Sequence, residues 1–197
     1  MRKARDGQPI PFSFAKRFVA EGPSKEYSIQ VDFLTSTDEE MSHRHSLIEG
    51  SLSAHKARGC SIAFDHNMVA EIGGVLPGNG EAQTKMKMLD ITGSIGMKGV
   101  VLGERYKEKD AYDIHSVVAN CLDGPRSIAE EVRSFQEEGL VNEGISNIKE
   151  KFASMRAAGP SWVGSFLHPY DTEMRERAQA ECFVKMREFL DALDLAK

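Results

Sequence analysis

The segment MKGVVLGERYKEKDAYDIHSVV, residues 97–118, places charged side chains at regular spacings within two apolar stretches. Lys98 and Arg105 are seven residues apart, close to two turns of an α-helix, so their side chains share about the same helix face. Asp110 and Asp113 are three residues apart, which makes them neighbours on a helix surface. The spacing therefore predicts two consecutive helices that can bring two cations and two carboxylates together.

Two interpretations of this charge pattern remain open from the residues alone. In the first, Lys98 or Arg105 forms a salt bridge between helices with Asp110 or Asp113, and such surface pairs are common and contribute little to stability. In the second, the charges serve binding or catalysis, because charges in segments that otherwise read as buried need a partner or a function.

The first of the two predicted helices is unusually rich in glycine. Each glycine in a helix interior costs about 0.8–1 kcal/mol relative to alanine. Close approach of the backbone to another element is the usual compensation. We therefore predict that this helix packs tightly against the predicted sheet and presents its cations at one edge; the glycines are Gly93, Gly96, Gly99 and Gly103.

Extended segments dominate the first part of the chain. Alternating apolar and polar residues predict strands at 10–20, 27–36 and 82–89, with two short strands within 60–76. The sequence PGNGEA, residues 77–82, predicts a hairpin turn through its Pro-Gly and Asn-Gly pairs. Residues 37–59 are polar without clean periodicity, and we expect a loop there with room for a short helix.

The period of the apolar residues becomes helical after Asp90, which stands where a helix N-cap is expected. The expected helices are at 91–106, 108–121, 126–138, 141–157 and 171–195, with the segment 159–169 interrupting the last two. Strands followed by helices are the pattern of an α+β fold. We predict an α+β domain over residues 1–121, with a mostly antiparallel or mixed sheet packed by helices, and a C-terminal helical region over residues 122–197 packed on it.

The overall composition excludes some classes of protein. No apolar run approaches the roughly 20 residues that cross a bilayer, and the basic N-terminus lacks the apolar part of a signal peptide. The three scattered cysteines predict reduced thiols and a cytoplasmic location. The net charge of −5 argues against a globally basic surface for nucleic acid.

The segment 97–118 resembles the closing motif of the AbiEii-type nucleotidyltransferase family, a branch of the polymerase-β-like superfamily. That motif has a lysine on a helix of small residues, an arginine about seven residues later, and Lys/Arg-Asp-x-x-Asp before an apolar helix. The matching residues are Lys98, Arg105, Lys109, Asp110 and Asp113. The upstream strand YSIQVDFLT is similar to the family's extended segment with an isolated acid, here Asp32. The resemblance covers roughly residues 9–121.

The resemblance implies a nucleotidyltransferase-like fold and transfer of a nucleotidyl group from a nucleoside triphosphate (NTP) to a hydroxyl. The superfamily's mechanism uses two divalent ions held by carboxylates, for which Mg²⁺ is suited. By analogy, Asp32 would be a catalytic metal ligand, and Lys98, Arg105 and Lys109 would bind the triphosphate or an acceptor. Lys98 and Asp110 would belong to the catalytic residues, with Asp110 orienting a cation or acting as a base. Asp113 would orient its neighbours.

One part of the family pattern has no counterpart here. The family's Gly-rich helix start and Asp-x-Asp pair precede the segment that resembles residues 9–35, so we expect this chain alone to be inactive. Three explanations stay open: a natural protein that starts further upstream, a second chain or copy that supplies the missing acids, or a fold that has lost catalysis and binds a nucleotide or protein. Full-length relatives often are toxins paired with an antitoxin, and the acceptor would be tRNA, a protein or a small molecule.

Overall fold

The computed structural model describes residues 12–19, 26–36, 45–49, 52–76, 80–121 and 123–195. Within these residues the protein is mixed α+β, which confirms the predicted fold class at that level. The chain divides into two compact units, Met1–Ser61 and Ile62–Lys197. The predicted division between residues 121 and 122 stays a prediction.

The first unit contains short strands. Its strands are β1 (Ser13–Val19), β2 (Glu26–Asp32), β3 (Leu34–Thr35), β4 (His45–Glu49) and β5 (Leu52–Lys56). β1 pairs antiparallel with β2, while β5 lies between β3, in parallel, and β4, in antiparallel orientation. The strands expected at 10–20 and 27–36 are confirmed where the structure describes them.

The expected loop over residues 37–59 is wrong for its second half, because β4 and β5 lie there. The sequence of β5, LSAHK, has too few apolar residues to show the alternation of a half-buried strand. Backbone pairing with its two neighbours forms this strand without that signal. Residues 37–44, 50 and 51 lie outside the described residues.

The second unit begins with a helix of one turn and a hairpin. α1 (Ile62–Asp65) stands where a strand was expected, so that prediction is wrong. The hairpin pairs β6 (Asn67–Val75) with β7 (Glu81–Leu89) in antiparallel orientation, which confirms the strands around the predicted turn. Turn residues 77–79 lie outside the described part of the chain. The hairpin is amphipathic, since its register aligns apolar pairs on one face: Met68 with Met88, and Ala70 with Met86.

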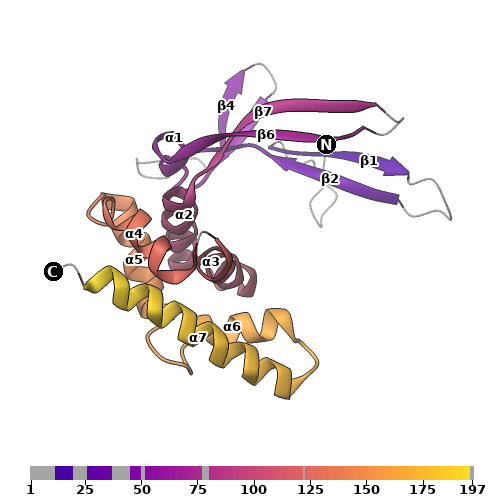
Figure 1. Ribbon diagram of the computed structural model, residues 1–197. Coiled ribbons are helices and arrows are strands. Elements are labelled where there is room, and N and C mark those ends of the chain that lie inside the picture. The colour runs from indigo at the N-terminus through magenta and orange to yellow at the C-terminus, as the bar shows by residue number, and fades with distance from the viewer. Residues whose placement is uncertain are drawn as a thin grey trace. The chain divides into compact units, whose positions relative to one another are not determined.

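Helices make up the rest of the second unit (Figure 1). They are α2 (Ile91–Glu104), α3 (Glu108–Asn120), α4 (Pro125–Arg133), α5 (Gly139–Lys151), α6 (Ala158–Leu167) and α7 (Thr172–Asp194). The five predicted helices are confirmed with shifted ends: all five end earlier than predicted, while α4 and α5 begin one and two residues earlier. Asp90 caps α2 by accepting a hydrogen bond from the backbone N–H of Gly93 at 2.7 Å. The expected interruption at 159–169 is wrong, because α6 lies there. Its Pro160 is in the first turn, where a helix needs no backbone N–H.

One hydrophobic core joins these helices on both sides of residue 121. Each helix from α2 to α7 except α6 contributes a large side chain with no exposed surface or almost none: Ile95, Ile114, Ile128, Ile148 and Phe189. α6 adds Val163 and packs along α7, as Figure 1 shows. The core fixes α2 and α3 side by side, and these helices carry the charged motif.

Gly96, Gly99 and Gly103 of α2 lie where its backbone meets α5, whereas a Cβ atom on Gly93 would meet the carbonyl oxygen of His66. A Cβ atom on Gly99 would collide with three backbone atoms of Gly144, and one on Gly144 would collide with the carbonyl oxygen of Gly96. Asn147 of α5 donates a hydrogen bond from Nδ2 to the Gly99 carbonyl at 3.1 Å. Close approach was therefore predicted correctly. The expected partner, the sheet, is confirmed at Gly93, where Leu89 of β7 is close, and is wrong for Gly99 and Gly103, which α5 approaches. The glycine spacing predicts that another backbone comes close, but it does not show which element that is.

The cysteines of the helical core give a first testable prediction. Cys182 of α7 is fully buried, and burial, aided by the charge of Glu181, raises its thiol pKa to about 12. Cys121, at the end of α3, is partly exposed. Because the thiolate is the nucleophile, only about one Cys182 thiol in 10⁴ is reactive at pH 8 even before access is considered. Iodoacetamide on the native protein should alkylate Cys121 far faster, as peptide mass spectrometry would measure. Equal native rates would contradict this, and in urea the two rates should converge.

Candidate functional site

The charged residues of the motif meet between α2 and α3. Lys98 donates hydrogen bonds from Nζ to Oδ2 of Asp113 at 2.7 Å and to Oδ1 of Asp110 at 3.3 Å. The helical spacing explains the contact, because Lys98 projects from the face of α2 that adjoins α3, whose first turn carries Asp110. The predicted grouping of cations and carboxylates is therefore present.

Arg105 completes the coordination of Asp110. It follows α2 directly and donates from Nε to Oδ2 at 2.8 Å and from Nη2 to Oδ1 at 3.0 Å. This paired arrangement is the strong geometry for a guanidinium with a carboxylate. Asp110 is only 2 % exposed, so one buried carboxylate holds both cations that α2 and its end supply.

Lys109 joins the group from the same helix as the acids. Its Nζ lies 2.8 Å from both Oδ1 and Oδ2 of Asp113, four residues later on α3. We call the five side chains of Lys98, Arg105, Lys109, Asp110 and Asp113 the charge cluster. With three cations and two carboxylates, the cluster carries a net charge of +1 at neutral pH.

Both carboxylates of the charge cluster are held in the ionised form. Burial alone would raise the pKa of Asp110, but the hydrogen bond from Arg105 and the charges of Arg105 and Lys98 outweigh it, so its pKa lies below the ordinary value. For Asp113, burial likewise opposes and hydrogen bonds from Lys109 and Lys98 prevail, so its pKa is also lowered. The ion pairs therefore persist throughout the neutral range.

The exposure of the cluster is uneven. The side chain of Asp110 is covered, whereas Lys98, Arg105 and Lys109 are 29, 48 and 63 % exposed. The salt bridges between helices are thus confirmed, and their positive ends still face solvent. A structural and a binding role are compatible, because the carboxylates fix the cations while part of each cation stays accessible.

Asp32 belongs to the first unit and the charge cluster to the second. It is the last residue of β2, stands opposite Ser13 of β1, and accepts hydrogen bonds from Nε2 of Gln30 at 2.7 and 2.6 Å. Its carboxylate is exposed, as expected for that face of the strand. The catalytic and metal-binding roles of Asp32 stay predictions.

The charge cluster does not offer a site for the Mg²⁺ ion that the resemblance implies at Asp32, and that ion stays a prediction. Among the described side chains, no group of three or more His, Cys, Asp and Glu residues is arranged to hold a metal ion. Asp110 and Asp113 direct their oxygens at lysine and arginine nitrogens rather than toward a common point. A divalent ion there would have to displace those cations.

Sequence reasoning missed an aromatic pair beside the cluster. Tyr106, which directly follows Arg105, contacts Trp162 of α6 edge to face, with ring centroids 5.8 Å apart. Tyr106 is also 84 % exposed. The two residues are far apart in sequence, so no periodicity could pair them, although an aromatic residue inside the charged stretch ERYKEK was a visible signal.

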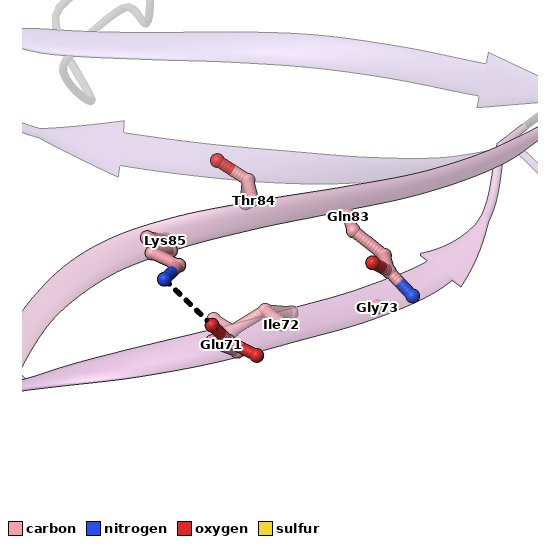
Figure 2. A pocket seen from close by; sticks show the side chains of 6 residues that line it. All are labelled: Glu71, Ile72, Gly73, Gln83, Thr84 and Lys85. Carbon is pink, nitrogen blue, oxygen red and sulfur yellow. Dashed lines mark ion pairs between the residues drawn. The ribbon is translucent and has the colours of Figure 1, made fainter.

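A separate open hollow of about 400 Å³ lies on the hairpin. Figure 2 shows Glu71 and Lys85 facing each other from β6 and β7, with Gln83 and Thr84 on the same strand as Lys85. Nζ of Lys85 lies 2.8 Å from Oε1 of Glu71, and both side chains are well exposed. This pair neutralises the charges of the hollow, which contains no residue of the charge cluster.

A comparison of the chain with models of known protein families, with curated proteins and with solved structures finds no match. The likeness to AbiEii-type nucleotidyltransferases therefore stays a prediction from the motif. None of the helices in the described ranges is both long and apolar enough to cross a membrane.

Proposed function

We propose that the protein is nucleotidyltransferase-like, of the AbiEii type, and that its charge cluster binds the phosphate groups of an NTP. One observation carries the proposal: the buried carboxylate of Asp110 fixes Lys98 and Arg105 next to each other while both cations remain partly exposed. The five residues that match the family's closing motif meet in the structure. The nucleotidyl acceptor, a Mg²⁺ requirement and an antitoxin or second-chain partner belong to the same proposal and rest on the resemblance.

The chemistry of the exposed donors suits phosphate. A guanidinium has five N–H donors, and only those on Nε and Nη2 are directed at Asp110. Lysine is a point charge that phosphate oxygens accept readily, and Lys98 and Lys109 flank Asp113 from two helices. Because the carboxylates hold the cations in position beforehand, a phosphate group would gain their charge at a reduced cost in side-chain ordering.

Binding of nucleotide should raise the melting temperature of the protein. A ligand at 100 times its Kd adds about 2.7 kcal/mol of stability, or roughly 5–10 °C for a chain of this size. We expect a rise of this kind with millimolar ATP or GTP, with and without Mg²⁺, measured by differential scanning fluorimetry. Lys98→Ala should abolish the rise, and Lys109→Ala should reduce it, because Lys109 contacts only the more exposed Asp113.

Arg126→Ala is the matched control for the nucleotide experiment. Arg126 is an exposed cation of α4 that pairs with Glu188 at 3.0 Å and lies outside the charge cluster. Its loss should leave the temperature rise intact. An unchanged melting temperature of the unmodified protein at millimolar nucleotide would refute the phosphate site. If Lys98→Ala lowered stability but left the rise intact, the cluster would have a structural role alone.

A non-catalytic nucleotide- or protein-binding module is the second candidate function. Asp110 and Asp113 both accept hydrogen bonds from lysine or arginine side chains. This favours a binding module, because a carboxylate held in this way is not available to accept a proton as a catalytic base. Incubation with NTP labelled at the α-phosphate separates the two candidates. Label that becomes attached to the protein or to added tRNA supports transfer, whereas bound but unreacted NTP supports the module.

A further inference from the structure

We propose that Tyr106 is the platform on which the base of the bound nucleotide stacks, beside the charge cluster. This inference rests on the proposed function and adds the nucleoside part of the ligand to it. Tyr106 directly follows Arg105, whose guanidinium reaches Asp110, so the ring and the cation come from one short connection between α2 and α3.

The ring of Tyr106 packs against Trp162. Trp162 meets it at an interplanar angle of 82°, so the contact is made through an edge and leaves ring surface open. Trp162 packs against the hydrophobic core of the helical unit, and this packing holds the aromatic pair in position. With 84 % of its surface exposed, Tyr106 offers a large apolar ring to solvent at a place where nothing in the core requires one.

The chemistry of the surroundings favours a single nucleotide. Every nucleobase has a π-face that stacks on an aromatic ring, and the two-ring purines cover more of it. In residues 104–109, every second residue is a cation: Arg105, Lys107 and Lys109. The residues between them are acidic, apart from Tyr106. The net charge of −5 on the chain disfavours a long polyanion, whereas a single triphosphate can reach the cluster cations and place its base on the ring of Tyr106.

The test compares two ligands on the full chain by isothermal titration calorimetry. GTP carries both phosphates and a base, whereas inorganic tripolyphosphate carries the phosphates alone. We expect Tyr106→Ala to weaken GTP binding about fivefold or more and to leave tripolyphosphate binding unchanged. Tyr106→Phe should retain GTP affinity, since it keeps the ring. Tyr170→Ala, at a fully exposed tyrosine between α6 and α7, is the control and should change neither affinity.

Trp162 supplies an independent optical readout, since it is the single tryptophan of the chain. GTP should change its fluorescence through Tyr106, and tripolyphosphate should not. If tripolyphosphate binds and Tyr106→Ala leaves GTP affinity unchanged, the base platform is overturned while the phosphate site stands. If neither ligand binds the unmodified protein, the proposed function fails and the platform fails with it. Circular dichroism of each variant shows that a lost affinity is not a lost fold.

Discussion

Gly99→Ala is expected to destabilise the protein by more than about 3 kcal/mol, beyond the usual cost of overpacking. The added methyl group would meet backbone atoms of Gly144, which cannot move aside as a side chain can. The helices α2 and α5 would have to separate, and the core between them would open. Urea denaturation followed by circular dichroism measures the change in the free energy of unfolding.

Gly139→Ala is the matched control, because it adds the same methyl group to α5 where no atom lies within 4 Å. It should stabilise the protein by about 0.4–1 kcal/mol, since alanine lowers the entropy of the unfolded chain. A Gly99→Ala protein as stable as the unmodified one would show that the two helix backbones are not in direct contact.

Asp110→Asn is expected to cost about 2–3 kcal/mol at pH 7, because it removes the charge that accepts hydrogen bonds from Lys98 and Arg105. The two cations would then repel each other, so we also expect nucleotide affinity to fall. Urea denaturation gives the stability, and calorimetry gives the affinity. Asp191→Asn, which breaks the exposed pair with Arg187 on α7, should cost no more than about 0.5 kcal/mol.

The cost of Asp110→Asn should depend on pH. Because the pKa of Asp110 is lower in the folded protein than the ordinary value of about 3.9, the unfolded chain binds the proton more readily. The carboxylate therefore contributes its full stabilisation above about pH 4 and loses it as pH falls through the lowered pKa. The difference in stability between the two proteins should shrink in that acidic range. A difference that stays constant down to pH 2 would show that the charge of Asp110 is not its source.

The residues that sequence reasoning placed correctly share a local geometry. The seven-residue step from Lys98 to Arg105 and the three-residue step from Asp110 to Asp113 fix side-chain directions once the helices form. Two consecutive helices with a short connection then have few ways to pack, so the charge cluster could be predicted. Spacing defines neighbours but no role, which is why both interpretations of the cluster were open from the sequence.

The features that were missed depend on partners distant in the chain. β5 is a strand because β3 and β4 lie beside it, and its own residues carry little of that information. The contact of Tyr106 with Trp162 exists because α6 packs against α3. Sequence patterns did not predict α6, because its first turn contains a glycine and a proline, which usually end helices. The glycines of α2 indicated a close contact, and only the assembled core shows that α5 makes it at Gly96, Gly99 and Gly103.

The hairpin of β6 and β7 makes the protein unevenly sensitive to oxidation. Met68, Met86 and Met88 are about half exposed on its apolar face, whereas Met186 is fully buried in the helical core. Oxidation to the sulfoxide turns a flexible apolar side chain into a polar one. Peroxide would therefore oxidise the hairpin methionines and the similarly exposed Met155 before it reached Met186, and would leave the helical core in place.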